Sequence, residues 1–271
     1  MATEWISPTW RMPNDKNQSK FENYSLDFNP VSANEDIKLG NTTYLLPGQP
    51  TAATTNNPKF SASIFFNFNS SVAGSAVWTM GAGQGGGATY WNLRKNTSDN
   101  LEANFRTTSG GYTTITGGTT LTSDTWYHAC VTWDGYNINL YLNGVSDATQ
   151  VAATTFYWST NPTYPPYPTI GSFRYSPSAI NNLWQGKLAQ PCIFDYALSQ
   201  GQIDYLYNSG TPQNPMAISG QPPIAYYPLG GSSTGSASTL TVPNESVADA
   251  TVFDFDGSSD YIDLDPGVMK T

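Results

Sequence analysis

The sequence is poor in charge. Only 11% of its 271 residues are Asp, Glu, Lys or Arg, well below the roughly 25% of an average globular protein. The few charges sum to a net charge of -9, so the chain has no basic field that could attract a phosphate backbone. The composition argues against nucleic-acid binding and predicts a surface solvated mainly by hydroxyl and amide groups.

A long hydrophobic run is also missing. The first ten residues contain neither a basic segment nor an apolar stretch of the length that a signal peptide or a membrane span requires. We therefore expect no contact with a membrane and no Sec-type export signal, although the composition is typical of an extracellular protein.

Cysteine and histidine are scarce, which limits the possible chemistry. Cys130 and Cys192 fall in expected strands without metal-ligand spacing. Two buried thiols are favoured, and a disulfide remains an alternative if the two strands lie side by side. His128 is the only histidine, so a Ser-His-Asp or Cys-His arrangement would have to include it. A structural role for this histidine is favoured.

Short segments of alternating apolar and polar residues, separated by turns, dominate the first half of the chain. In the clearest of them, residues 60–68, one face holds Phe60, Ala62, Ile64 and Phe66, and the other holds Ser61, Ser63 and Asn67. Further strands are expected at residues 24–28, 36–39, 76–80, 89–93, 101–105 and 112–115. Such a succession predicts a β-sandwich.

Residues 126–144 give the strongest local signal. Apolar and polar residues alternate on both sides of an Asp134-Gly135 turn, and an Asn143-Gly144 turn follows. The pattern Trp-x-His-x-x-x-Thr-Trp-Asp-Gly, followed by Leu-Tyr-Leu-Asn-Gly, resembles the hairpin of laminin-G-like domains. This resemblance implies a concanavalin A-like antiparallel sandwich, or jelly roll.

One short helix is expected over residues 197–207. Ser199 and Gln202 can form a capping box there, and Leu198 and Ile203 can form a hydrophobic staple. Residues 170–207 resemble the closing portion of a laminin-G-like domain. The expected fold class is therefore all-β, a concanavalin A-like sandwich with one short C-terminal helix.

The chain divides into four expected parts: an N-terminal arm at 1–22, the sandwich at 23–210, a linker at 211–223 and a partial repeat of the start of a second sandwich at 224–271. About fifty residues cannot build a sandwich core of their own. We expect the strand at 224–230 to complete the sheet of the first domain, in the same chain or in a neighbouring subunit.

A proline-rich segment, residues 156–168, predicts a long surface loop with aromatic side chains. Exposed rings beside polar groups can stack on the C–H faces of sugars. The candidate ligand-binding residues are Trp158, Tyr164, Tyr167, Arg174 and Tyr175. By contrast, Trp78, Trp126 and Trp133 are expected to fill the core.

Other motifs predict no chemistry. The glycine-rich residues 81–87 lack the lysine and the helix of a phosphate-binding loop, and are expected to connect two strands. The Glu-x-Asp-x-x-Glu string that the resemblance implies for glycosidases is missing. The acidic series Asp254, Asp256, Asp260, Asp263 and Asp265 is expected to be a solvated strand end. We predict no enzymatic activity.

Calcium is the one cofactor that the resemblance makes possible, because many laminin-G-like domains bind it at the rim of the sandwich. Ala189 and Gln190 stand where an acidic pair would be expected, which removes charge from such a site. We therefore expect no metal or other cofactor.

Two function classes remain. The first is a non-catalytic structural protein on a virion surface, such as a capsid decoration, fibre or tail-associated component of a phage, since similar repeats occur in marine phage proteins. Its expected partners are other virion proteins, further copies of itself in an oligomer, and cell-surface polysaccharide. The alternative is a soluble carbohydrate-binding or adhesion module of an extracellular protein. A glycoside hydrolase is a third and remote reading.

Overall fold

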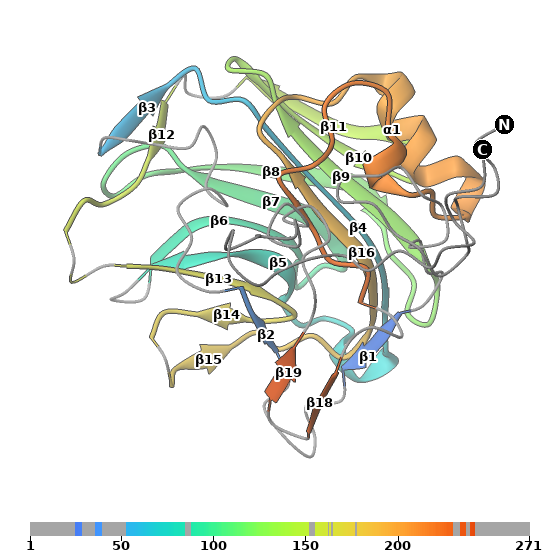
Figure 1. The fold of residues 1–271 in the computed structure, drawn as a ribbon. Helices are drawn as coiled ribbons and strands as arrows, with labels where there is room; N and C mark the ends of the chain where they lie inside the picture. Colours follow the sequence, from blue (N-terminus) through green and yellow to red (C-terminus); the bar gives the residue numbers. More distant parts are fainter. Residues whose placement is uncertain are drawn as a thin grey trace, which may run out of the picture.

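Two large antiparallel sheets contain most of the strands in the described part of the chain (Figure 1). The computed structural model describes residues 25–28, 36–39, 53–84, 88–151, 155–161, 163, 165–176, 178–229, 234–236 and 239–241. The part of the expected partial repeat after residue 241, with its acidic series from Asp254 to Asp265, lies outside these described residues, as does the arm at 1–22.

The larger sheet has seven strands. Its order is β1 (Leu26–Phe28), β16 (Gly186–Phe194), β4 (Phe60–Phe68), β9 (Tyr127–Trp133), β10 (Asn137–Leu142) and β11 (Val145–Val151), with β17 (Ala225–Tyr226) pairing with β16.

The smaller sheet has six strands. Its order is β2 (Ile37–Lys38), β13 (Pro166–Ile170), β5 (Val77–Gln84), β6 (Ala88–Lys95), β7 (Asn100–Arg106) and β8 (Tyr112–Thr120). Three strand pairs are separate: β3 (Thr54–Asn56) with β12 (Thr155–Tyr157), β14 (Phe173–Arg174) with β15 (Ile180–Asn181), and β18 (Thr234–Ser236) with β19 (Thr239–Thr241).

The core lies between the two sheets and follows the predicted alternation. Phe60, Ala62, Ile64 and Phe66 all belong to the buried cluster, as the pattern of residues 60–68 predicted. Aromatic contacts join the layers: the rings of Phe60 and Trp91 are 4.8 Å apart, and those of Phe105 and Trp133 are 5.0 Å apart. The architecture confirms the predicted all-β sandwich.

Helix α1 (Gln200–Tyr207) covers the outer face of the seven-stranded sheet (Figure 1). It begins with the predicted capping box, in which the Ser199 N–H donates to Gln202 Oε1 at 2.9 Å. Ile203 and Leu206 are buried against the sheet in one cluster with Leu198. Short 3₁₀ turns follow Phe68 and α1: η4 (Ser70–Val72), η5 (Asn208–Gly210) and η6 (Pro215–Ala217).

The two cysteines stand on either side of one strand. Cys130 on β9 and Cys192 on β16 are both opposite Ser63 on β4, which runs between them. Strands are about 4.8 Å apart, so the two Cα atoms lie about 10 Å apart, beyond the roughly 7 Å that a disulfide can span. Both thiols are free and buried, as the favoured interpretation held.

The proline-rich segment is not one long loop, which corrects the prediction for residues 156–168. Its start lies in β12 and its end in β13. The carbonyl of Pro168 accepts from Leu39 N at 3.0 Å, on the side away from β5. Because the N and C=O of one strand residue point to the same side, the missing N–H of Pro168 removes no bond to β5.

Two further predictions were wrong. Residues 81–84 of the glycine-rich segment belong to β5 rather than to a connection. Gly83 is needed there because a Cβ atom would stand 1.7 Å from the carbonyl oxygen of Arg174. Trp133 is fully buried as expected, but Trp126 is 44% exposed. The side chain of Trp78 lies outside the described part of the structure.

The segment after the linker docks on the same chain. β17 pairs with β16, with Ala225 opposite Ile193 and Tyr226 opposite Cys192. Ala225, Tyr226, Tyr227 and Leu229 are all buried. This strand therefore extends the seven-stranded sheet and covers part of the hydrophobic cluster beside α1.

Candidate functional site

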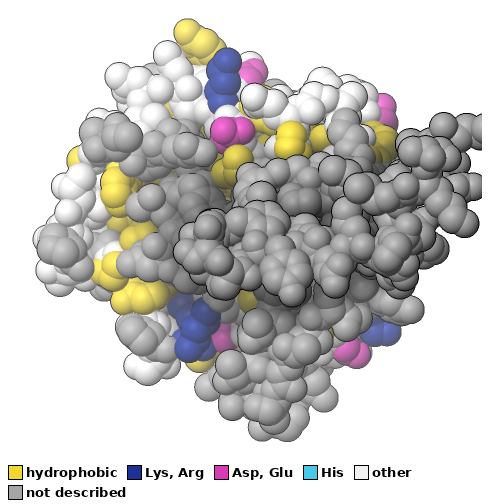
Figure 2. Space-filling model, viewed as in Figure 1, with side chains coloured by type: hydrophobic (Ala, Val, Ile, Leu, Met, Phe, Trp, Pro, Cys, Tyr) yellow, Lys and Arg dark blue, Asp and Glu magenta, His cyan; other side chains and the backbone are white. Residues whose placement is uncertain are grey.

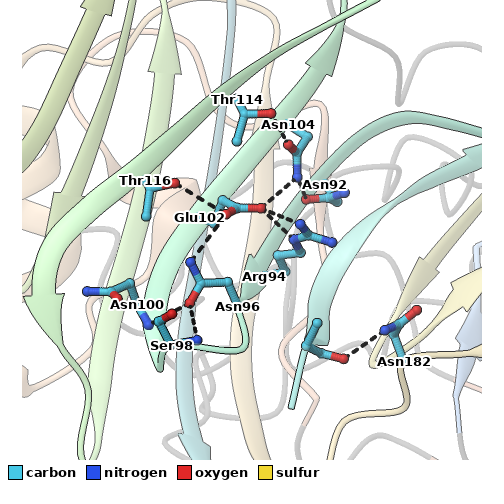
Figure 3. Close-up of polar contacts among 11 residues, drawn as sticks. Asn92, Arg94, Asn96, Ser98, Asn100, Glu102, Asn104, Thr114, Thr116 and Asn182 are labelled. Atoms are coloured by element: carbon cyan, nitrogen blue, oxygen red, sulfur yellow. Dashed lines mark hydrogen bonds and ion pairs between the residues drawn. The ribbon is translucent and has the colours of Figure 1, made fainter. Parts of the chain in front are cut away.

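Polar side chains form two ordered rows on the outer face of the six-stranded sheet (Figure 3). The core contains apolar residues at alternate positions of β6, β7 and β8, so their neighbours in between point outward. The buried residues are Trp91 and Leu93 on β6, Leu101, Ala103 and Phe105 on β7, and Ile115 on β8. One row is Asn92, Asn104 and Thr114, and the other is Arg94, Glu102 and Thr116. We call these six residues the polar face.

Hydrogen bonds connect the members of each row and join the two rows. Arg94 Nε donates to Glu102 Oε1 at 2.8 Å, and the Thr116 hydroxyl donates to Glu102 Oε2 at 3.2 Å. Asn104 Nδ2 donates both to Asn92 Oδ1 at 3.0 Å and to Glu102 Oε1 at 3.2 Å. The Thr114 hydroxyl donates to Asn104 Oδ1. Glu102 is therefore the centre of the network (Figure 3).

The Glu102 carboxyl is held in its ionised form. Its burial opposes ionisation, but hydrogen bonds and the positive charge of Arg94, together with hydrogen bonds from Asn96 and Asn104, outweigh that effect. The pKa of Glu102 is consequently lower than that of an ordinary Glu. A carboxylate that already accepts from these groups fixes their orientation and is poorly suited to transfer a proton.

Part of the polar face is open to solvent. Thr114 and Thr116 are exposed, and the side chain of Arg94 is 29% exposed. The arrangement thus offers hydroxyl, amide and guanidinium groups that are held in place by buried partners. Such groups can exchange hydrogen bonds with the hydroxyls of a ligand.

An aromatic group borders the polar face. Tyr112, opposite Arg106 in the β7–β8 ladder, is 44% exposed. Its phenol oxygen accepts from Thr89 N at 3.3 Å, so the side chain bridges β8 and β6. The guanidinium of Arg106 is buried and lies 4.7 Å from the ring centre of Tyr157. An exposed ring therefore stands next to the polar rows.

The predicted candidate residues occupy different places. Trp158 is partly buried against the core. Tyr167 on β13 is opposite Gly83, against which the backbone of Arg174 packs. Tyr175 has its ring 5.5 Å from that of Phe173. Tyr164 lies outside the described residues. Tyr167 and the backbone of Arg174 therefore both lie next to Gly83.

Arg174 has a structural partner. Its guanidinium forms a buried two-point ion pair with Asp36, with Nη2 donating to Oδ1 at 2.7 Å and Nε to Oδ2. The Ser172 hydroxyl also donates to Asp36 Oδ2, at 2.8 Å. These contacts join β14 to the start of β2.

Sequence reasoning missed the polar face. Polar and apolar residues alternate in two of the strands that the sequence predicts. The polar residues are Asn92 and Arg94 in one strand and Glu102 and Asn104 in the other. This pattern was the available signal, but it does not say which residues of different strands stand opposite one another.

His128 is buried on the outer face of the seven-stranded sheet. A hydrogen bond of 2.7 Å joins its Nε2 to the Ser63 hydroxyl, and its ring lies between Phe65, at 4.7 Å, and Tyr207, at 5.8 Å. Its Nδ1 is buried without a hydrogen-bond partner among the described residues. Burial lowers the pKa of His128 from 6.5 to about 3.

This histidine makes stability depend on pH. The pKa of His128 is lower in the folded than in the unfolded protein, so a falling pH protonates the unfolded chain first. The stabilising contribution of the neutral imidazole to the free energy of unfolding is complete above pH 6.5 and is lost as the pH falls toward 3. Between pH 7 and pH 5 we expect a loss of about 2 kcal/mol in the free energy of unfolding, measured by urea denaturation. The pKa values of three carboxyl groups, those of Asp99, Glu102 and Asp134, are below their ordinary values. Their protonation therefore lowers the free energy of unfolding only at a pH below this interval.

The control is the double variant Ser63→Ala/His128→Leu, which removes the only histidine together with its hydroxyl partner. Its stability should change little over the same interval. An equal slope in the two proteins would show that another group is responsible.

Metal ligands are not gathered in the described residues: no group of three or more His, Cys, Asp or Glu could hold an ion. At the position considered for calcium, Ala189 is opposite Phe65. Gln190, which follows it, accepts through Oε1 from the Tyr226 hydroxyl. Gln190 therefore helps to hold β17 on the sheet, and Ala189 packs beside Phe65.

Among the described residues on the face drawn in Figure 2, the Lys and Arg side chains do not form a basic patch. Figure 2 shows the coloured Lys and Arg side chains standing apart from one another on this face. Within the described residues, no helix has the length and apolar character needed to cross a membrane.

The sequence matches a known protein family over most of the sandwich. Residues 39–204 match the laminin G-type family described as the concanavalin A-like lectin/glucanases superfamily. The chain belongs to this family. The matched range includes the polar face, Trp126 and the start of α1. No curated protein matches the chain.

Several solved structures are similar to this concanavalin A-like protein. The IT-sialidase CBM40 of Ruminococcus gnavus bound to α2,3-sialyllactose is 13% identical, with a TM-score of 0.50, covering 66% of this chain and 94% of its own. A putative carbohydrate binding protein from Bacteroides ovatus is 19% identical, with a TM-score of 0.48, covering 71% and 51%. A heptameric pentraxin from Limulus polyphemus is 12% identical, with a TM-score of 0.47, covering 73% and 85%. At these identities the likeness is one of fold.

Proposed function

We propose that the protein is a non-catalytic carbohydrate-binding protein and that its polar face holds the hydroxyl groups of a glycan. The observation that carries this proposal is the double row of hydrogen-bonded side chains centred on Glu102, with exposed hydroxyls along β8. The lectin-like sandwich of the family supports it.

The chemistry of the polar face suits a sugar. Sugar hydroxyls both donate and accept, and Asn, Thr and Arg side chains supply matching groups. The exposed ring of Tyr112 offers an apolar surface for the C–H face of a pyranose next to these groups. Since the polar partners already hold one another in place, little side-chain ordering is needed when a ligand binds.

Binding without hydrolysis is favoured by the state of Glu102. A glycosidase needs one carboxyl that can donate a proton and a second carboxylate across the sugar bond. Glu102 is the single acidic residue of the polar face, and Arg94 keeps it ionised.

The double variant Thr114→Val/Thr116→Val tests the site. It keeps the shape of both exposed side chains but removes two hydroxyls, each able to contribute about 1 kcal/mol to binding. We expect its affinity for the glycan to fall about 10- to 30-fold. A glycan microarray identifies the ligand of the wild-type protein, and calorimetry then measures both affinities.

The matched control is Thr122→Val, an exposed threonine beyond β8, which should bind like the wild type. Absence of any ligand on the array, or unchanged affinity of the double variant, would remove the polar face as a glycan site.

We further propose that the protein is displayed on a virion surface, as a phage decoration, fibre or tail-associated component. The support is its composition, with 11% charged residues and a surface rich in hydroxyl and amide groups. Its partners there would be other virion proteins or further copies of itself, and the bound polysaccharide would belong to the host cell. Mass spectrometry of purified virus particles tests this role. If the protein is absent from the particles, an extracellular adhesion module is favoured instead.

A further inference from the structure

A groove of about 390 Å³ lies on the outer face of the seven-stranded sheet, the opposite side of the sandwich from the polar face. Phe65 and Ala189, which are opposite each other on β4 and β16, belong to its lining. Other residues of the lining are Trp126, Lys187, Ser25 and Pro212. The volume is within the range of small-ligand sites, roughly 300–1,000 Å³.

Trp126 is the unusual member of this groove. Its side chain is 44% exposed, although the core contains the other tryptophans of the family hairpin and of β6. It stands two residues before His128 and so points to the same outer face as that residue. The neighbouring Phe65 is nearly buried, and its ring lies 4.7 Å from that of His128 at an angle of 43°, so aromatic side chains form the floor of the groove.

Polar groups border the aromatic floor on the β1 side. Lys187 is exposed and is directly opposite Asp27 on β1 and Asn67 on β4. Directly opposite residues have their Cβ atoms about 5 Å apart on one face of the sheet. An ammonium donor, a carboxylate acceptor and an amide are thus grouped beside an exposed indole, with the Ser25 hydroxyl also in the lining.

We propose that this groove is a second carbohydrate site, which binds one neutral pyranose ring. The C–H face of the sugar stacks on Trp126, and its hydroxyls bond to Lys187 and Asp27. The nearby opposite charges favour an uncharged ligand with both donors and acceptors. This inference rests on the proposed carbohydrate-binding function and extends it: two sites on opposite sides of the sandwich allow one molecule to bridge two glycan chains.

Saturation-transfer NMR on the full chain tests the groove directly. The probes are methyl α-D-mannopyranoside, methyl β-D-glucopyranoside and methyl β-D-galactopyranoside, each at millimolar concentration. We expect transfer to the ring protons of at least one probe, a loss of at least fivefold in Trp126→Ala, and retention of most of it in Trp126→Phe, which keeps an aromatic ring.

The control for surface aromatics is Tyr136→Ala, in the β9–β10 turn and 61% exposed, which should leave the transfer unchanged. Transfer that persists in Trp126→Ala, or no transfer to any probe, would overturn the groove site.

The two sites can be separated. The variant Thr114→Val/Thr116→Val should keep the groove signal while losing affinity on the array. If the array signal depends on the polar face and the groove signal is missing, the proposed function stands and this inference fails. If neither is present, both fail.

Discussion

Replacing Tyr226 by alanine is expected to lower the free energy of unfolding by about 3–5 kcal/mol, the range observed for removing a large aromatic side chain from a packed interior. Tyr226 is 2% exposed, packs with the cysteines and α1, and donates its hydroxyl proton to Gln190. For a domain of this size the melting temperature should fall by about 10 °C.

The conservative variant Tyr226→Phe separates packing from hydrogen bonding. It removes only the hydroxyl and should cost about 1–2 kcal/mol. Tyr136→Ala, at an exposed turn, should melt like the wild type. If Tyr226→Ala also melted within a degree or two of the wild type, β17 would not contribute to the stability of the sandwich.

The second large effect is expected at Lys95. This lysine is fully buried, lies 5.0 Å above the ring of Phe68, and donates to the carbonyl of Ser75 at 2.8 Å and to the carboxylate of Asp99. Replacing it by methionine keeps the apolar stem but leaves these oxygens without their donor. We expect a loss of about 2–3 kcal/mol in the free energy of unfolding, because the buried donor is lost while the carboxylate of Asp99, whose side chain is 23% exposed, can still be hydrated.

Two further variants test whether the loss of stability comes from the buried contacts of Lys95. Lys59→Met, at an exposed lysine just before β4, should have little effect. Adding Asp99→Asn to Lys95→Met should recover part of the stability, because the carboxylate no longer lacks a cation. Urea denaturation at pH 7 measures all four proteins. Equal stability of Lys95→Met and the wild type would mean that water replaces the ammonium without cost.

Local patterns predicted the elements whose structure is decided locally. The alternation in β4, the turn residues beside β10 and the capping box of α1 each act over a few residues, and each was confirmed. β13 differs, because its prolines are tolerated only where their nitrogens face away from β5. That orientation depends on which strand lies on each side, and so on the whole sheet.

The polar face shows the same limit for the site. Asn92, Asn104 and Thr114 form one row only because of the register between three strands, and an irregularity between Asn100 and Glu102 shifts that register. A shift of one residue would send these side chains into the core. For Trp126 the prediction of a core position was wrong, because it relied on the apolar character of the side chain. The place of this residue two positions before His128 puts it on the outer face.

The position of β4 between Cys130 and Cys192 has a consequence for where the protein can be made and used. The two thiols cannot form a bond with each other, so packing, hydrogen bonds and ion pairs hold the sandwich together without a disulfide. Glutathione in a cell or oxygen outside it leaves that balance unchanged. The stability of the described sandwich should therefore be the same under reducing and oxidising conditions.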